Sequence, residues 1–524
     1  MSSNVIVATR ELEVSDDRRS RTPKILDQVL TYGLCALLIF GVLAFGAVEE
    51  WSAFAFEAGA AALFLIWAGK QIAVRNVGLS KNPLCLPAII FFVFILAQIL
   101  LRTSAYSYVT RYEALQYASY GIVLLITAEC VRANDTRRIF ALVMTLFGCL
   151  YAFFALAQDL TANGKLFWIR SQRFHGAIYG SYVNRDHYAG LMEMLVPIPL
   201  AISMSHLLIG GKRILVAFCA ILMASTIFLC ASRGGMITFV LEMVLLAALI
   251  LGKRCSPRAL LGYAAICVFI LALISFSSKG QVMGRIGDLD PGIRPQITKD
   301  SLKMFLQRPI WGWGLGTFPI VYPRYRSFYT NLFIKEAHND YAQLLTEMGL
   351  LGFTLALWFL TGVYRRGLLA SQRWQNHWDG MLSLAALIGC TGILLHSFVD
   401  FNLQIPANAA LFYVLCALAA AEPMAEALFT RRTRPKALDS VEALIPDRQR
   451  RMCHFQGRLT FEWITIRRTN VAETPVTRNF GDNLHLRTTR SGTEERIVRA
   501  GGTDIHQRPR HKRSACFESE LTFW

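Results

Sequence analysis

Apolar segments recur along the chain as far as residue 425, and each is about as long as a membrane-spanning helix. Such a helix needs about 20 residues that are mostly apolar, and about twelve segments meet this length. The sequence therefore predicts an all-α, polytopic integral membrane protein. The predicted spans are residues 28–48, 52–69, 84–101, 114–131, 138–157, 188–208, 214–231, 235–252, 258–276, 349–364, 381–399 and 408–422.

The composition agrees with this class and excludes others. Hydrophobic residues make up 54% of the 524 residues and charged residues 17%, whereas a soluble domain has about 25% charged residues. Disorder of most of the chain is excluded because it needs low hydrophobicity, and the length excludes a small disulfide-bonded scaffold. Most of the 12 cysteines fall in predicted spans, where cysteine is usually a small apolar residue. No pair has metal-ligand spacing, so we expect neither a metal nor a cofactor.

Lysine and arginine residues follow the even-numbered spans, and this sets the predicted orientation. Short loops rich in Lys and Arg face the cytoplasm, and the N-terminal tail is basic as well. Both termini are therefore predicted to be cytoplasmic, without a cleavable signal peptide. The basic residues after these spans are Lys70, Arg75, Lys81, Arg132, Arg137, Arg138, Lys212, Arg213, Lys253, Arg254, Arg258, Arg365 and Arg366.

Three regions follow from this pattern. Residues 1–27 form a cytoplasmic tail, and residues 28–425 form the membrane domain, with a large outer loop at 277–348. Residues 426–524 form a basic cytoplasmic tail that shows no helical or alternating apolar pattern, so we expect it to be disordered. Its charge favours contact with anionic membrane lipid. No recognition motif accompanies that charge, so no nucleic-acid partner is expected.

Several arginines lie in loops that this orientation places outside, where Lys and Arg should be scarce. Arg233 is the clearest, because it sits in a tight turn, 231–235, between two predicted spans. For one such arginine a carboxylate or a lipid headgroup is a sufficient partner. Several on one side favour an anion site, because a guanidinium binds phosphate oxygens bidentately. The others include Arg170, Arg173, Arg185, Arg285, Arg294, Arg308, Arg324 and Arg326.

The outer loop ends in a segment that places a histidine before a helix. Asn339 or Asp340 is a suitable N-cap, and Gly349 is a suitable stop or bend. His338 would then lie at the positive end of a helix, which disfavours the imidazolium form. A neutral imidazole accepts a proton near pH 7, which makes His338 a candidate general base. The alternative is a histidine that only caps the helix or forms an interface hydrogen bond.

Other polar residues of the outer loops have weaker patterns. His175 and His187 could be ligands or bases, but such residues more often order a loop. Gly312-Trp313-Gly314-Leu315-Gly316 follows no strand of a βαβ unit, so it is interpreted as a turn with an interfacial tryptophan rather than a dinucleotide site. Asp400, at the outer end of the eleventh span, could pair with an arginine or orient a substrate.

Taken together, these motifs resemble the O-antigen ligase and polymerase family of bacterial envelope glycan enzymes. The resemblance covers roughly residues 28–425 and rests on the order, spacing and side of the motifs. They are Gly180-Ser181-Tyr182-Val183-Asn184-Arg185-Asp186-His187-Tyr188-Ala189, Ser232-Arg233-Gly234-Gly235, Gly312-Trp313-Gly314-Leu315-Gly316-Thr317-Phe318, Ala337-His338-Asn339-Asp340-Tyr341 with residues 347–352, and His396-Ser397-Phe398-Val399-Asp400-Phe401-Asn402 with residues 405–407.

The resemblance implies a metal-independent, inverting glycosyltransferase in the bacterial inner membrane. Its donor would be a glycan on undecaprenyl diphosphate at the periplasmic face. The family's diphosphate-binding arginines match Arg233 and Arg294, and its essential histidine matches His338. The matching motifs also make Asn184, Arg185, Asn339 and Asp400 candidates for substrate binding.

Two further choices stay open at this point. A ligase transfers the glycan to lipid A-core, whereas a polymerase transfers it to another lipid-linked repeat unit, and we favour the ligase slightly. A transporter or flippase for a lipid-linked glycan also fits the spans and the outer arginines. Against it, the two halves show no matching pair of interrupted helices. A scaffold protein would explain the spans but not the outer arginines.

Overall fold

The computed structural model describes residues 24–74, 82–171, 178–331 apart from 252–291, and 333–421. All of them belong to one compact unit, Met1–Arg431. The ninth predicted span, the start of the outer loop, His175 and the basic tail lie outside the described residues. The prediction of a disordered tail therefore stays a prediction.

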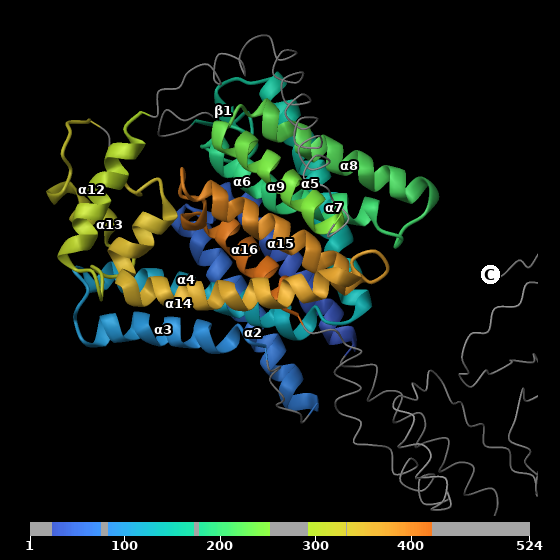
Figure 1. The fold of residues 1–524 in the computed structure, drawn as a ribbon, viewed down its shortest axis with the longest axis horizontal. Helices are drawn as coiled ribbons and strands as arrows, with labels where there is room; N and C mark the ends of the chain where they lie inside the picture. The colour runs from blue at the N-terminus through green and yellow to red at the C-terminus, as the bar shows by residue number, and fades with distance from the viewer. Residues whose placement is uncertain (1–23, 75–81, 172–177, 252–291, 332, 422–524) are drawn as a thin grey trace, which may run out of the picture. The chain divides into compact units, whose positions relative to one another are not determined.

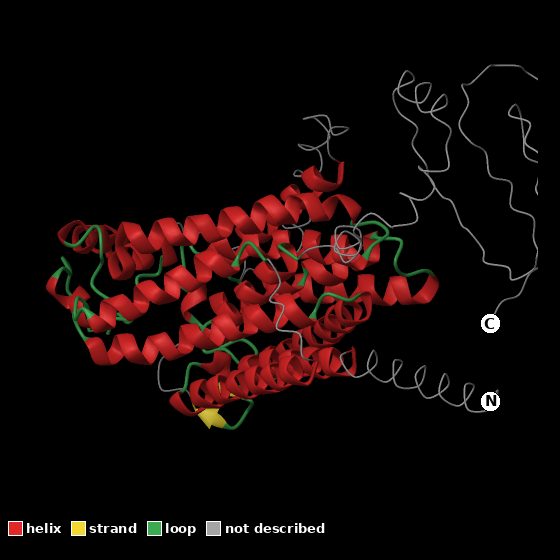
Figure 2. Cartoon of the chain, turned by 90° about the horizontal axis from the view of Figure 1, so that it is seen from below, coloured by secondary structure: helices red, strands yellow, loops and turns green. Residues whose placement is uncertain are grey.

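The described part of the chain is mostly helical, which confirms the predicted all-α class (Figures 1 and 2). The exception is a small antiparallel pair of strands, β1 (Lys165–Leu166) and β2 (Arg170–Ser171). An N-terminal helix, Lys24–Leu43, precedes the labelled elements. The helices are η1 (Phe45–Ala47), α2 (Glu50–Val74), α3 (Cys85–Leu100), α4 (Ser107–Cys130), α5 (Asn134–Leu160), α6 (Arg185–Leu195), α7 (Pro197–Met204), α8 (Gly210–Leu229), α9 (Arg233–Leu251), α12 (Arg294–Gln307), α13 (Phe318–Val321), η3 (Tyr322–Arg324), α14 (Asp340–Ala370), η4 (Ser371–Arg373), α15 (Trp378–His396), η5 (Asn402–Gln404) and α16 (Pro406–Ala419).

Every predicted span within the described residues coincides with helix. Among these residues, 7 helices are long and apolar enough to cross a membrane. α3 and α16 are apolar but shorter, and the sixth predicted span is divided into α6 and α7. The division falls at Pro197, whose ring and missing N–H are incompatible with an uninterrupted helix. The protein is thus a multi-pass membrane protein, while the count of twelve spans stays a prediction.

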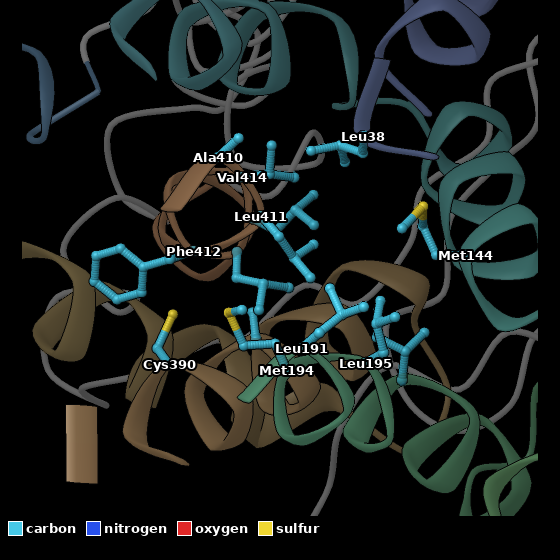
Figure 3. Close-up of a cluster of buried hydrophobic side chains, with 14 of the residues drawn as sticks. Leu38, Met144, Leu191, Met194, Leu195, Cys390, Ala410, Leu411, Phe412 and Val414 are labelled. Carbon is cyan, nitrogen blue, oxygen red and sulfur yellow. The ribbon is translucent and has the colours of Figure 1, made fainter. Parts of the chain in front are cut away.

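α15 forms the centre of the packed helices. It contacts α16, α14, α9, α7 and α6. In its most apolar 18-residue stretch, 78% of the residues are buried inside the protein. Leu191, Met194 and Leu195 of α6 and Leu411 of α16 meet beside it (Figure 3). This packing fixes the end of α15, from which the segment that contains Asp400 continues.

The end of the predicted outer loop is ordered by the first turns of α14. This helix begins at Asp340, well before the predicted start of the span, and bends at Gly349, as expected (φ 62°, ψ −167°). A side chain on Gly349 would collide with the carbonyl group of Ile310. Glu347 accepts hydrogen bonds from the N–H groups of Gly316 (2.9 Å) and Phe318 (3.1 Å). The glycine-rich segment is therefore a turn held against α14, as the sequence indicated.

Candidate functional site

Asp400 brings together two histidines that are far apart in the sequence, His187 and His338. Its Oδ1 lies 3.4 Å from Nδ1 of His338, and its Oδ2 lies 3.6 Å from Nε2 of His187. The ring of Phe401 packs edge-on against both imidazoles, with centroids 4.7 Å and 4.6 Å away. Asp400 is fully buried, whereas the side chain of His338 is 28% exposed. One carboxylate therefore orients a histidine that can still reach a substrate.

The backbone around His338 is shaped by the start of α14. Asn339 is the N-cap, and its side chain accepts a hydrogen bond from the N–H of Ala342 at 3.0 Å. His338 itself adopts a left-handed conformation with φ 52°, which is uncommon for a residue other than glycine and is frequent at functional sites. Asp340 then accepts a hydrogen bond from the hydroxyl of Ser397 (2.7 Å). These contacts hold His338 beside the segment that carries Asp400.

Arg294 completes this group of charges. Its guanidinium donates to Asp186 (2.9 Å) and to the carbonyl oxygen of Val399 (2.8 Å), and it lies 3.9 Å from Asp400. Arg294 is the first residue of α12, so Pro295 occupies the first turn, where a missing N–H breaks no helical hydrogen bond. With 38% of the Arg294 side chain exposed, the guanidinium can also contact a bound anion.

The charges of the site stabilise one another. Burial alone would raise the pKa of Asp400, but the charge of His187, the hydrogen bond from His338 and the charge of Arg294 together hold that pKa below its usual range. Burial would likewise lower the pKa of Arg294, and the carboxylates of Asp400 and Asp186 raise it instead. The site thus carries a carboxylate and a guanidinium in their charged forms near neutral pH.

The turn that carries Arg233 packs against the same segment. Ser232 caps α9 by accepting a hydrogen bond from the N–H of Gly235 at 3.1 Å. Gly234 lies directly on the end of α15, because a Cβ there would be 2.6 Å from His396 Nε2 and 3.2 Å from Val399 Cγ2. Arg233 is half-buried. The structure therefore brings the Arg233 turn next to the segment that continues into Asp400.

The remaining predicted residues lie around this group but have structural contacts of their own. Asn184 caps α6 by accepting a hydrogen bond from the N–H of Asp186 (2.9 Å), and its amide lies 3.4 Å from His187. Arg185 begins α6 and is half-buried. The amide of Asn339 donates to the carbonyl of Phe398 (3.0 Å). A role in substrate binding stays a prediction for these three residues.

The sequence alone gives only a weak signal for two residues of the site. His187 has the pattern of a residue that orders a loop, and Asp186 stands out only as part of a motif. The one available signal was their position directly after Asn184 and Arg185. Their partners, Asp400 and Arg294, are more than a hundred residues away along the chain, so no local pattern indicates the pairing.

The arrangement favours acid–base and anion-binding chemistry. Among the described residues, no group of three or more His, Cys, Asp or Glu side chains has the geometry to hold a metal ion. An oriented imidazole beside a guanidinium can accept a proton and contact an oxyanion in one place.

A large apolar cavity opens beside the site. It has a volume of about 710 Å³ and lies between α3, α4, α14 and α16. Its walls include Phe92, Tyr117 and Phe412, and it reaches Asp340 and Tyr341 at the start of α14. The apolar cavity therefore reaches residues two and three positions after His338 in the sequence.

The fold and the site define a multi-pass helical membrane protein with a histidine, carboxylate and arginine group at its helix ends. Residues 218–357 match the family model described as O-antigen ligase. This match confirms the resemblance to the O-antigen ligase and polymerase family and indicates a glycosyl-transferring membrane enzyme. It includes Arg233, Arg294 and His338, whereas His187 and Asp400 lie outside the matched residues. No curated protein was found to match the chain.

Proposed function

We propose that this protein transfers a glycan from undecaprenyl diphosphate to an acceptor hydroxyl at the periplasmic face of the bacterial inner membrane. Transfer would proceed with inversion and without a metal ion, and the acceptor would be lipid A-core. The observation that carries this proposal is the pairing of His338 with the buried Asp400, 3.4 Å away, beside Arg294.

The pairing suits His338 for the role of general base. When Nδ1–H donates to Asp400, the other ring nitrogen, Nε2, is free to accept a proton. The acceptor hydroxyl would give its proton to Nε2 as its oxygen bonds to the anomeric carbon. Proton transfer of this kind is typically worth about 10²–10⁴-fold in rate.

The leaving group requires stabilisation of negative charge. As the bond between the anomeric carbon and the diphosphate oxygen breaks, its electron pair stays on undecaprenyl diphosphate. Arg294 and Arg233 would hold the phosphate oxygens, because a guanidinium binds them bidentately in a partly desolvated site. Arg294 is held by Asp186, so little reorganisation is required during the reaction.

The apolar cavity supports a lipid-linked donor. An isoprenoid chain is apolar, and the cavity walls from α3, α4 and α14 are mostly aliphatic and aromatic. Because the cavity reaches Asp340 and Tyr341, a chain that lies in it would place its polar end near His338. A diphosphate joined to that chain could then reach Arg294.

The test uses the purified full-length protein in detergent, with undecaprenyl-diphosphate-linked glycan, a chelator and either lipid A-core or a second lipid-linked repeat. Transfer to lipid A-core supports the ligase, while chain growth on the lipid carrier supports the polymerase. His338→Ala should abolish transfer, and His206→Ala, at an exposed histidine, should not. Donor movement across vesicles without transfer to either acceptor would favour the transporter instead.

A further inference from the structure

Three ionisable side chains lie buried beneath the site, and the proposed mechanism uses none of them. They are Glu193 on α6, Glu242 on α9 and His396 on α15, each at most 1% exposed. His396 Nδ1 lies 3.1 Å and 3.2 Å from the two carboxylate oxygens of Glu193. Ionisable residues inside a membrane domain are costly and are retained mainly where they have a function.

The Glu193–His396 pair supports the turn that carries Arg233. A Cβ on Gly234 would be 2.6 Å from His396 Nε2, and one on Gly235 would be 3.2 Å from Glu193 Oε1. The backbone of this turn therefore rests on both members of the pair. A shift of either side chain would move the first residues of α9, where Arg233 lies.

The same histidine begins the segment that carries Asp400. The carbonyl oxygen of His396 accepts hydrogen bonds from the N–H groups of Val399 (3.0 Å) and Asp400 (3.1 Å). The carbonyl oxygen of the neighbouring Ser397 accepts a hydrogen bond from the N–H of Asp340 (3.0 Å). His396 is thus connected to the start of α14, where His338 lies, as well as to Asp400.

We propose that the buried Glu193–His396 pair is a positioning element that fixes the Arg233 turn relative to Asp400 and His338. It touches no substrate. It acts by holding the ends of α9 and α15 at a fixed distance from each other. Arg233 and His338 can then contact the same donor molecule.

Glu242 offers a matched control within the same buried cluster. Its carboxyl group lies against Gly392, one helical turn before His396, and both its oxygens are without a hydrogen-bond partner among the described residues. An unpaired buried carboxyl group is costly to ionise. We therefore expect the protein to tolerate Glu242→Gln, which places a neutral amide of the same shape there. Glu193→Gln instead replaces one of the two carboxylate oxygens that His396 Nδ1 contacts.

The kinetic part of the test rests on the proposed function. Glycan transfer by detergent-purified full-length protein should fall at least tenfold in kcat for Glu193→Gln, with a smaller change in donor KM. Glu242→Gln should stay within about twofold of the unaltered protein. Because the pair acts as a unit, Glu193→Gln combined with His396→Gln should lose no more than the worse single variant. Equal losses for Glu193→Gln and Glu242→Gln, or full activity of Glu193→Gln, would overturn the proposal.

Hydrogen–deuterium exchange tests the same inference without substrate. Glu193→Gln should raise exchange in peptides that cover residues 232–235 and 397–400, whereas Glu242→Gln should not. Unchanged exchange in both peptides would overturn the positioning role even if activity fell. If the unaltered protein transfers no glycan but exchange behaves as stated, the proposed function fails and the positioning role stands.

Discussion

Oδ1 of Asp400 lies 3.4 Å from Nδ1 of His338, although the two residues belong to different helix ends. In the proposed mechanism, this contact holds His338 in the tautomer whose Nε2 accepts a proton. Asp400→Asn keeps the shape but removes the charge and can present an N–H to the ring instead. We expect kcat to fall about 10²–10⁴-fold with donor binding retained, as measured by transfer kinetics and by binding of the lipid-linked donor. Unchanged kcat would show that Asp400 does not orient the base.

Arg233 should not tolerate replacement by lysine. A lysine side chain would keep the positive charge but would lack the planar pair of donors that binds two phosphate oxygens. We expect Arg233→Lys to lose most transfer activity, with a higher donor KM. Arg326→Lys, at an exposed arginine of the large predicted outer loop, is the control. Near-normal kinetics of Arg233→Lys would refute bidentate binding by this residue.

The buried Glu336 should make the stability of the folded protein depend on pH. Burial raises the pKa of Glu336 to about 7, against the opposing effects of Lys335 and of the hydrogen bond from Gln343. The folded protein binds this proton more tightly than the unfolded chain does. The proton therefore adds to the free energy of unfolding, and this contribution is fully present below the unfolded pKa of about 4.3. It is lost as the pH rises through about 7.

The measurement compares thermal unfolding of Glu336→Gln and the unaltered protein at pH 5 and pH 8. At pH 8, the Tm of Glu336→Gln should rise relative to the Tm of the unaltered protein. Glu50→Gln, at an exposed carboxylate, should show no such change between the two pH values. A difference in Tm that does not depend on pH would contradict the assignment.

Gly349 should resist substitution. Its φ of 62° and its contact with the Ile310 carbonyl leave no place for a Cβ. We expect Gly349→Ala to destabilise the protein by at least about 1–3 kcal/mol, measured as a lower Tm or a lower yield of folded protein. Gly69 of α2 has nothing within 4 Å of an added Cβ, so Gly69→Ala should be neutral or stabilising. Equal effects of the two substitutions would show that the bend is not constrained.

The basic C-terminal tail should be dispensable for chemistry. The site is built from residues between Asn184 and Asp400, all before the tail. Removal of residues 431–524 should leave transfer rates within about twofold, with folding checked by size-exclusion chromatography. An inactive but folded truncated protein would assign a function to the tail.

Much of the fold follows from local sequence patterns. Span length and apolar content are properties of consecutive residues, and they located the N-terminal helix, α2 to α9 and α14 to α16. They did not predict α12 and α13, which lie in the predicted outer loop. The N-cap at Asn339 and the bend at Gly349 were also predictable, since capping and positive φ depend on single residue types. The break between α6 and α7 was missed because the apolar run continues through Pro197 and Pro199, and hydropathy does not register a lost backbone donor.

The site was predictable only in part. The motifs supplied His338, Arg233, Arg294 and Asp400 as separate candidates, and the structure joins three of them directly. Their geometry depends on how α6, α12, α14 and α15 pack, which no local pattern contains. The Glu193–His396 pair was missed for the same reason, because a single Glu or His inside an apolar span has no signature until its partner is in place.

Asp400 divides its two carboxylate oxygens between two imidazoles, so one side chain joins the start of α6, where His187 lies, to the start of α14, beside His338. A movement of either helix end would therefore change the surroundings of both histidines. Under the proposed function, a proton that His338 takes from one acceptor must return to water before His338 can act on the next acceptor.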